Sequence, residues 1–590
     1  MYLKFLLSYT IISIGMNKVQ APSTSNARFE LRSERLGPLP LVNHFIARLG
    51  LHELLNKHVP TQDRRNALTH ASALGVLLRS IVVEREPVYR QQETVQGFAG
   101  GLFGITESEF ARLSDDRIGR ALDHLFYADR AALITEVVLA SVRGFDLQLQ
   151  QLHNDSTSIS FCGQYRNSAS TSLGAGKRTA AAITYGFSKD HRPDLKQLLF
   201  ILTVEGESGV PVSFRCADGN TSDSVTHLDT WSALREVAGR ADFLYVADSK
   251  LCSRDNLKTI HTAGGRFVTV LPRSRLEDGE FRKWIQTNTP EWELVWDRPN
   301  PRYKDGPSDR WSVFVPELPS AEGWPVIWVH STLLALKQEA TRKRHLGAAT
   351  EQLQALHQRL IKGRARLRGA AQIDQLVADI LQRYDVTRYI RVKRVVRTED
   401  RFKQASRGRP NQNTVYVKIT KKRYDIEYQL DSEALAYDQK SVGMYPLLTN
   451  DRKLTASEVL QAHKGQPRIE KRFEQVKTVH QIAPVYLKDP GRIEALFTLY
   501  FLALLVQCLI ERELRLAMQR GQIKQLALYP EQRQCKKSTT ELVLRLFSHT
   551  QRHTLMQSGQ ILQTFEPQFT ELQHQVLGLL GVTSEDFQKK

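Results

Sequence analysis

The strongest constraint on the fold is the order of strand-like and helix-like segments between residues 144 and 271. Three β-type runs come first: one that reaches a carboxylate at Asp155, then Leu195–Val204 and Val210–Cys216, joined by a turn of Gly, Glu and Ser. A helical segment follows, and after it a short apolar strand ends at Asp248. A second helix and a last strand complete the series. Two strands of one predicted sheet therefore end on an Asp.

Three antiparallel strands followed by helix, strand, helix and strand is the order of the ribonuclease-H-like fold. In that fold the first and fourth strands are neighbours, so we expect Asp155 and Asp248 together at one rim of the sheet. The sequence therefore predicts an α/β protein with a ribonuclease-H-like catalytic core.

A third carboxylate comes from a predicted helix far downstream, over residues 466–477. Its apolar residues recur at three- and four-residue spacing: Ile469, Phe473 and Val476. Glu470 and Lys477 are two helical turns apart and project from the same face. Arg468 and Arg472 flank them. A solvated amphipathic helix would show this pattern too, but the two upstream Asp residues favour a site that holds a metal beside a phosphate.

Convergent carboxylates without His or Cys suit Mg²⁺, with Mn²⁺ as a substitute, because hard cations prefer oxygen ligands. Two such ions ~3.5–4 Å apart would activate a nucleophile and stabilise the leaving oxygen of a phosphodiester. We therefore predict that Asp155, Asp248 and Glu470 are both the metal ligands and the catalytic residues. His153 and His191 are interpreted as local hydrogen-bonding groups rather than zinc ligands.

The charge of the chain points to a polyanionic partner. Its 590 residues carry a formal net charge of +19, which favours nucleic acid over an anionic membrane because each cation near a phosphate releases condensed counterions. The five cysteines are scattered and form no Cys-x-x-Cys pair, so neither a disulfide framework nor a zinc ribbon is supported. A reducing, cytoplasmic setting is expected.

Two apolar segments bear on membrane association. Residues 1–15 resemble the apolar part of a signal peptide but lack a convincing cleavage site, and the run is too short to span a bilayer. We interpret residues 1–30 as a disordered or misannotated leader, with translation from Met16. The run Ala495–Ile510 carries polar residues and ends in charges, so it is interpreted as a buried core helix and no membrane partner is expected.

The remaining pattern divides the chain. Residues 31–143 are helical throughout and predict an all-helical N-terminal domain, and residues 521–590 predict a helical C-terminal region. The catalytic domain covers 144–520, with a large insertion at about 275–450 because the segment between Asp248 and Glu470 is far longer than a minimal fold needs. A long basic helical tract occupies about 333–384. The insertion also holds six of the seven tryptophans: Trp284, Trp292, Trp296, Trp311, Trp324 and Trp328.

Several short blocks carry a family resemblance over roughly residues 31–520: His153–Ser158, Tyr185–Asp194, Gly219–Asp223, Val246–Asp248, and Arg468–Glu470 with Lys477. Together they resemble bacterial insertion-sequence transposases with a DDE catalytic triad. More narrowly, the sequence is similar to the group around insertion sequence four, in particular its branch numbered sixteen-thirty-four.

This resemblance implies a DNA transposase that cleaves the ends of an insertion sequence and joins them to target DNA. Its triad would hold two Mg²⁺ ions, and Lys477, with Arg468 and Arg472, would contact DNA near the scissile phosphate. Asn220 or Asp223 would support the metal ligands. The partners would be terminal inverted repeats and target DNA, bound by a homodimer because two ends are cut. In related transposases, aromatics of an inserted β-domain stack on a displaced base; packing within a β-subdomain is the alternative for each tryptophan.

The sequence departs from the family at two positions. The family pattern is Tyr, two residues, Arg, three residues, Glu, six residues, Lys; here His463 and Gln466 stand where Tyr and Arg are expected. The departures leave Glu470 and Lys477 in place, and Glu474 is a rival third ligand. Two alternatives stay open: a catalytically inactive, DNA-binding derivative of a transposase, and a ribonuclease-H-like nuclease without strand transfer.

Overall fold

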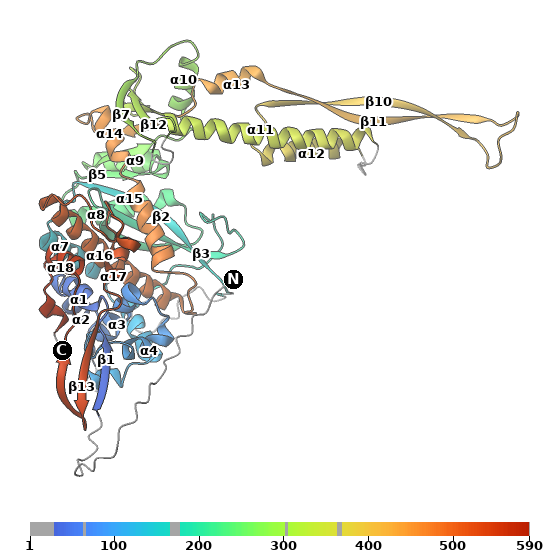
Figure 1. Ribbon diagram of the computed structural model, residues 1–590. Coiled ribbons are helices and arrows are strands. Elements are labelled where there is room, and N and C mark those ends of the chain that lie inside the picture. Colours follow the sequence, from blue (N-terminus) through green and yellow to red (C-terminus); the bar gives the residue numbers. More distant parts are fainter. Residues whose placement is uncertain are drawn as a thin grey trace.

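The computed structural model describes residues 29–62, 67–163, 165, 178–300, 305–362 and 369–588. The protein is a mixed α/β structure with a large mixed sheet, a helical body packed against one end of that sheet, and a long arm that projects from the other end (Figure 1). Residues 1–28 of the predicted leader, 1–30, lie outside the described residues.

The central sheet has nine strands in the order β4-β3-β2-β5-β6-β12-β9-β8-β7. The first five in chain order are β2 (Gln151–Phe161), β3 (Lys196–Glu205), β4 (Pro211–Asp218), β5 (Leu244–Ala247) and β6 (Arg266–Val270). β3 pairs antiparallel with both β2 and β4, whereas β5 pairs in parallel with both β2 and β6. The first and fourth strands are therefore neighbours, as the sequence predicts. β2 continues past the expected end near Asp155, to Phe161.

The parallel strands are linked by helices, as parallel pairing requires. These are α8 (Asp223–Ala238) between β4 and β5 and α9 (Arg254–Thr262) between β5 and β6. β5 is buried along its whole length, which explains why it appears in the sequence as a short unbroken apolar run.

The insertion predicted at about 275–450 extends the central sheet. After α10 (Leu276–Trp284), four of its strands join the sheet beyond β6: β7 (Glu293–Arg298), β8 (Asp309–Phe314), β9 (Val326–Ser331) and β12 (Met444–Thr449). β12 pairs antiparallel with β6 on one side and with β9 on the other. The insertion and the core therefore share one sheet.

Between β9 and β12 the chain leaves the sheet and forms the arm (Figure 1). Its elements are α11 (Thr332–Ile361), α12 (Ala370–Arg383), β10 (Ile390–Gln404), β11 (Tyr416–Leu430) and α13 (Ser432–Gln439). The helical tract predicted over about 333–384 is thus two helices. β10 and β11 form a separate two-stranded antiparallel sheet.

A long apolar helix, α16 (Pro490–Arg520), lies at the centre of the body. By length and composition it could cross a membrane, but 89% of its most apolar window is buried inside the protein. Phe497 stacks on Phe161 of β2, and Phe501 stacks on Phe214 of β4. On its other side α16 packs against N-terminal helices. The predicted core helix is confirmed.

The N-terminal helices share this core. They are α1 (Leu39–Arg48), α2 (Leu51–His58), α3 (His70–Val83), α4 (Gln91–Gln96), α5 (Glu107–Phe110), α6 (Asp115–Tyr127) and α7 (Arg130–Phe145). One continuous hydrophobic cluster runs from Leu36 in this region through the sheet and α16 to Phe587. The N-terminal and C-terminal regions are therefore parts of one body.

The C-terminal region, 521–590, is not purely helical, which corrects the sequence prediction. Between α17 (Thr540–Leu546) and α18 (Glu571–Leu580) the chain forms a hairpin of β13 (Gln551–Gln557) and β14 (Gln560–Phe565). β1 (Phe29–Arg35) adds to β13 as a third antiparallel strand. The N-terminal region thus begins with a strand.

Candidate functional site: a carboxylate cluster beside helix α15

Asp155 and Asp248 meet where β2 and β5 run side by side. The parallel register pairs Leu152 with Tyr245 and His153 with Val246. Continuing it by two residues brings Asp155 beside Asp248, which directly follows β5. Adjacent strands lie about 4.8 Å apart, and the charge of Asp248 helps to raise the pKa of Asp155. The pairing predicted from the strand order is present.

Both carboxylates are held where their charged forms are disfavoured. Burial raises the pKa of Asp155 to about 6, and the charges of Asp248 and Asp223 add to that rise. Burial is also the main cause of the raised pKa of Asp248. A backbone N–H donates to each: Ser156 N to Asp155 at 2.7 Å, and Lys250 N to Asp248 at 3.0 Å. The cluster therefore has an excess of negative charge in a partly buried place.

Asp223 is the third member of this cluster. It begins α8 and accepts a 2.6 Å hydrogen bond from Ser156 Oγ, so its carboxylate is tied to the residue next to Asp155. The family resemblance implies that Asn220 or Asp223 supports the metal ligands. The structure brings Asp223 to Asp155 by this bond.

Sequence reasoning missed Lys189, whose ammonium group lies among these carboxylates. Its Nζ is 3.1 Å from Asp223 and 3.6 Å from Asp155, and it donates to the carbonyl and hydroxyl oxygens of Ser156 at 2.6 and 2.8 Å. Lys189 thus partly offsets the negative charge of the cluster. The residue lies inside the Tyr185–Asp194 block of the family resemblance, which was the available signal.

The loop that carries Lys189 is fixed against β3 and β4 by a close backbone approach. A side chain at Gly186 would meet the carbonyl oxygen of Gly219 at 1.9 Å, so only Gly fits there. The amide of Gln197 donates to the carbonyl oxygens of both Gly219 and Phe187, at 2.7 and 3.1 Å. Lys189 N donates to Ser158 Oγ of β2 at 3.1 Å.

The helix with the third predicted carboxylate, α15 (Pro467–Glu474), docks onto β2 next to Asp155. Gln466, just before the helix, donates to the carbonyl oxygen of Asn154 at 3.1 Å and bonds His153 Nδ1 at 3.2 Å. His153 also bonds Gln151 at 2.8 Å, and burial lowers its pKa to about 4. The interpretation of His153 as a local hydrogen-bonding group is confirmed.

Glu470 lies one helical turn after Gln466, on the same side of α15, and its side chain is exposed. Within the described residues, no three His, Cys, Asp or Glu side chains are close enough together to hold a metal ion. The structure gathers Asp155, Asp248 and Asp223 around Lys189, though not as a group of three that could hold a metal ion, and leaves Glu470 on the neighbouring helix, outside that group. Glu474 is exposed as well.

Two of the three predicted DNA contacts lie at the surface. Arg468 is exposed and contributes to the lowered pKa of His153 through its charge. Lys477 lies in a π-helical turn, Gln475–Val479, that continues α15, and its Nζ is 2.8 Å from both carboxylate oxygens of Asp190. Lys477 would have to leave Asp190 to reach a phosphate.

Arg472, the third predicted DNA contact, is buried, and this corrects its assignment. Its guanidinium donates to the carbonyl oxygens of Gly209 and Ser208, at 2.8 and 3.0 Å, and to Gln475 Oε1 at 3.1 Å. It also pairs with buried Glu511 of α16 at 3.1 Å. With every nitrogen engaged inside the protein, Arg472 joins α15 to the core.

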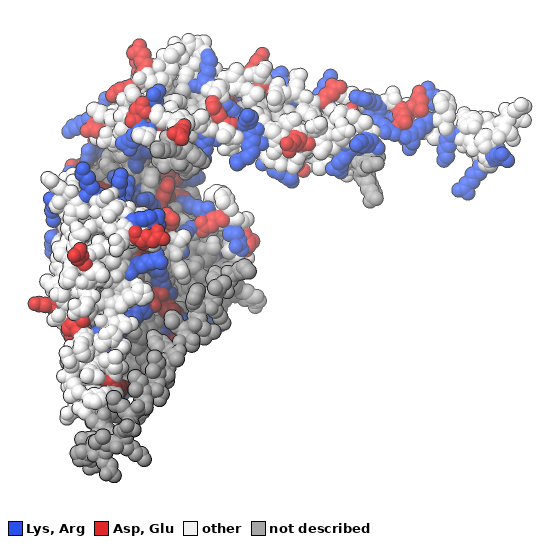
Figure 2. Space-filling view, in the orientation of Figure 1, with Lys and Arg blue, Asp and Glu red and all other residues white. Residues whose placement is uncertain are grey.

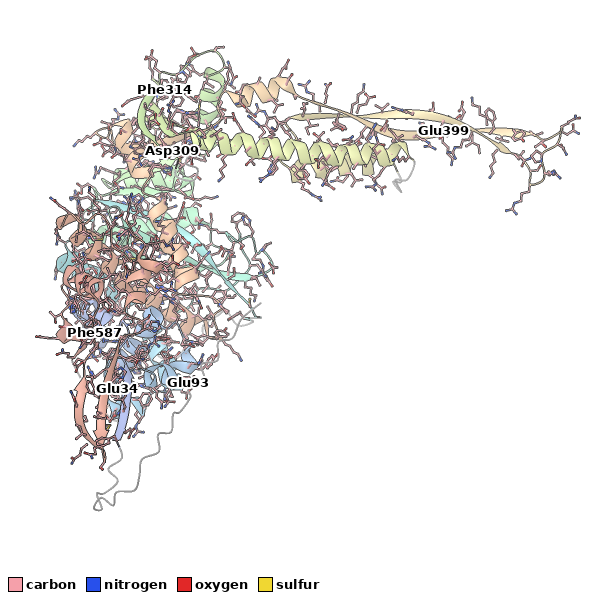
Figure 3. All side chains as sticks on the ribbon, in the orientation of Figure 1. Glu34, Glu93, Asp309, Phe314, Glu399 and Phe587 are labelled. Atoms are coloured by element: carbon pink, nitrogen blue, oxygen red, sulfur yellow. The ribbon has the colours of Figure 1, made fainter. Side chains whose placement is uncertain are left out.

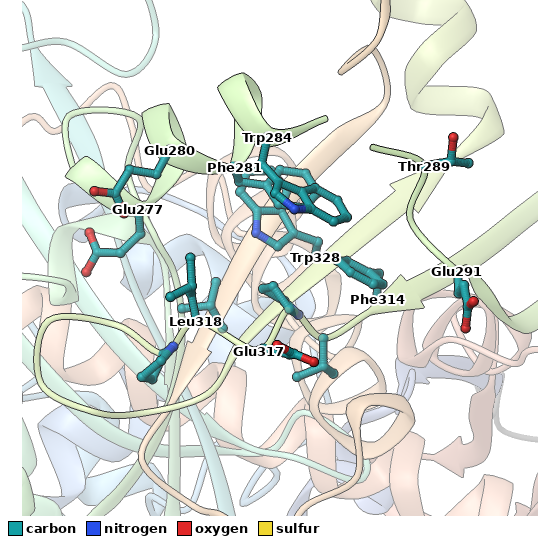
Figure 4. A pocket seen from close by; sticks show the side chains of 14 residues that line it. Glu277, Glu280, Phe281, Trp284, Thr289, Glu291, Phe314, Glu317, Leu318 and Trp328 are labelled. Atoms are coloured by element: carbon teal, nitrogen blue, oxygen red, sulfur yellow. The ribbon is translucent and has the colours of Figure 1, made fainter. Parts of the chain in front are cut away.

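Two tryptophans of the insertion, Trp284 and Trp328, line a second, separate site. A cavity of about 500 Å³ lies between α10, β8 and β9 (Figure 4). Phe281 stacks on Trp328 with ring centroids 3.8 Å apart, and Trp284 stacks on Phe314 at 5.6 Å. Four glutamates line the same cavity: Glu277, Glu280, Glu291 and Glu317. Ring packing and acidic lining favour the packing interpretation over a pocket for a DNA base.

Comparison with known proteins covers one part of the chain. Residues 31–139 match a family described as a domain of unknown function, DUF4277, and domains of this family are found in transposase-like proteins. The match corresponds to β1 and the N-terminal helices, not to the carboxylate cluster. No curated protein matches the chain.

Proposed function

We propose that the protein is a DNA transposase with a ribonuclease-H-like catalytic core whose active site is built from Asp155, Asp248 and Glu470. The observation that carries this proposal is the parallel pairing of β2 with β5, which sets Asp155 beside Asp248. Support also comes from the net charge of +19 and from the DUF4277 match of the N-terminal region. Because a transposase brings two element ends together, the proposal includes a homodimer on DNA.

The carboxylate oxygens of the cluster are suitable ligands for a divalent cation. Burial raises the pKa of both Asp155 and Asp248, so a cation that neutralises them would bind favourably. Carboxylate oxygens without His or Cys suit Mg²⁺ or Mn²⁺. Asp155, Asp248 and Glu470 would hold the ions, and bound ions of this kind supply an activated water and stabilise the leaving oxygen in phosphodiester cleavage.

The other residues of the site would position and balance these groups. Gln466 and His153 hold α15 against β2. The exposed Glu470 side chain would turn toward Asp155 by a change of rotamer when the ions bind. Lys189 would stabilise the carboxylates before a metal binds. Lys477 would exchange Asp190 for a phosphate oxygen when DNA arrives, because both are anionic acceptors.

A second candidate is a DNA-binding protein derived from a transposase that no longer cuts DNA. The observation that favours it is the exposed Glu470, which lies outside the cluster of Asp155, Asp248 and Asp223. The use of Gln466 as a structural link to β2, at a position where the family has Arg, points the same way.

The proposal is tested by incubating the full chain with Mg²⁺, duplexes taken from the DNA that flanks its gene, and a supercoiled target plasmid. We expect cutting at a defined end and a joined product, both absent with Asp248→Ala. Cutting without end preference or joining would leave a nuclease. Binding without cutting by either protein would establish the inactive derivative.

A further inference from the structure

The arm ends in a long β-hairpin that projects away from the body (Figures 1 and 3). β10 and β11 each have 15 residues and pair without a register shift from Ile390–Leu430 at the base to Gln404–Tyr416 at the tip. At about 3.3 Å per residue, each strand spans roughly 50 Å. Glu399 lies well out along this hairpin (Figure 3).

Only the base of the hairpin is packed. Ile390 and Ile426 are buried in a small core with residues of α11 and α12 such as Leu353 and Ile373. The distal half of the hairpin, residues 396–422, has exposed or half-buried side chains throughout, and Phe402 is 67% exposed. A two-stranded ribbon of this kind is marginally stable in water by itself, so we expect it to have a partner.

The distal half is strongly basic, and Lys and Arg side chains gather along the arm (Figure 2). Residues 396–422 contain two acidic residues, Glu399 and Asp400, and eight basic ones: Arg397, Arg401, Lys403, Arg407, Arg409, Lys418, Lys421 and Lys422. Within the described part of the chain, five of these cations form no ion pair: Lys403, Arg407, Arg409, Lys421 and Lys422. Their charge is available to an external polyanion.

We propose that the distal half of the β10–β11 hairpin binds duplex DNA, with the ribbon lying in the major groove. This inference rests on the proposed function for its choice of nucleic acid. The major groove of B-DNA, about 12 Å wide, admits a two-stranded β-ribbon. Cations on the ribbon would reach phosphates on both sides. Exposed rings on one face of the ribbon, those of Phe402 and Tyr416, would face base edges, where thymine methyl groups accept apolar contacts.

The shape of the arm supports DNA over a protein partner. The distal part of β10, residues 396–404, spans about 30 Å, which is close to one turn of B-DNA at about 34 Å per turn. The unpaired cations lie on both strands and at the tip, which suits the two phosphate backbones that border a groove. A protein surface would have to offer a comparable row of carboxylates.

The first experiment measures how DNA affinity of the full chain depends on salt. The arm variant Lys403→Gln, Lys421→Gln and Lys422→Gln removes three exposed, unpaired cations of the hairpin. The control variant Lys258→Gln, Arg520→Gln and Lys524→Gln removes three exposed cations from the body. Both variants lose the same charge, and their exposed positions leave the fold intact, which thermal unfolding checks.

The slope of log Kobs against log salt concentration is negative. We expect the arm variant to reduce the magnitude of this slope by about 2–3, because each lost phosphate contact removes roughly 0.9 from it. The control variant should change the slope by less than the roughly 0.9 that one phosphate contact contributes. Equal slopes in the two variants would overturn the arm proposal while leaving the proposed function standing. Failure of the wild type to bind duplex DNA would instead overturn the proposed function.

The second experiment tests the groove. Duplexes whose cytosines carry glucosylated hydroxymethyl groups have a filled major groove, whereas netropsin occupies the minor groove. Wild type should bind unmodified duplex DNA more tightly than the arm variant does. Most of this difference in affinity should disappear on the glucosylated duplex and persist when netropsin is present. The reverse result would overturn the major-groove placement. If the arm variant instead shifted from dimer to monomer while its salt slope stayed unchanged, the partner of the hairpin would be a protein.

Discussion

The ammonium group of Lys189 lies 3.6 Å from a carboxylate oxygen of Asp155. This contact places a protein cation beside the carboxylate proposed to bind a metal, and it accounts for how the cluster tolerates its negative charge. Lys189 also contacts Asp223 at 3.1 Å, so its removal affects more than one carboxylate.

Replacing Lys189 by Met should make the protein more dependent on metal. The variant loses a favourable charge interaction, so we expect a lower unfolding temperature than wild type in EDTA and a larger rise on addition of Mg²⁺. Differential scanning calorimetry with and without Mg²⁺ measures both. The exposed Lys258→Met is the control. A Mg²⁺ response of the same size in wild type and Lys189→Met would show that Lys189 does not bear on the metal site.

Replacing Asp155 by Asn should stabilise the metal-free protein at alkaline pH. Burial raises the pKa of Asp155 from 3.8 to about 6, so the folded state disfavours the ionised carboxylate, and wild type loses stability as the pH rises through 6. We expect Asp155→Asn to be more stable than wild type by about 3 kcal/mol at pH 8 in EDTA, with the difference shrinking toward pH 4. Urea unfolding at both pH values measures it, with exposed Asp229→Asn as control. A difference independent of pH would contradict the burial argument.

Arg472 and Arg468 should have separable effects. Arg472→Lys breaks a buried network with Glu511 and two backbone carbonyls, and we expect it to lower the free energy of unfolding by about 3 kcal/mol. Arg468→Gln changes an exposed side chain, so it should leave stability unchanged and weaken DNA binding. Chemical unfolding and fluorescence anisotropy on a duplex measure the two effects. If Arg472→Lys were as stable as wild type, its structural role would be wrong.

Glu470 and the rival ligand Glu474 can be compared directly. Both are exposed on α15, so Gln at either position should fold normally. We expect Glu470→Gln to abolish Mg²⁺-dependent cleavage and Glu474→Gln to retain it, because Glu470 lies on the side of α15 that Gln466 anchors to β2. Loss of cleavage in Glu474→Gln alone would transfer the assignment to Glu474.

The parts of the fold that sequence predicts are those fixed by local apolar pattern. The buried run of β5 and the order of the first five strands were sufficient to place Asp155 next to Asp248. The pairing of β12 with β6 could not be predicted in this way, because the partner strand lies far along the chain and its pattern does not specify which edge it joins. The pairing of β1 with β13 could not be predicted either, because it joins opposite ends of the chain.

The site was only partly predictable for a similar physical reason. Asp155 and Asp248 follow from strand order, but the approach of Lys189 depends on the contact between the backbones of Gly186 and Gly219, which no periodicity reveals. The burial of Arg472 depends on Glu511 of α16. In the sequence alone, an Arg on an amphipathic helix has the appearance of a surface cation.

The central claim is that the Asp155–Asp248 pair catalyses metal-dependent cleavage of DNA. Its most direct test is the single-turnover cleavage rate of a gene-flanking duplex in Mg²⁺, for wild type and for Asp248→Asn, with DNA binding measured in parallel. Loss of a metal ligand removes several kcal/mol of transition-state stabilisation, so we predict a rate lower by roughly a thousandfold or more with binding unchanged. Cleavage by Asp248→Asn at the wild-type rate would contradict the account.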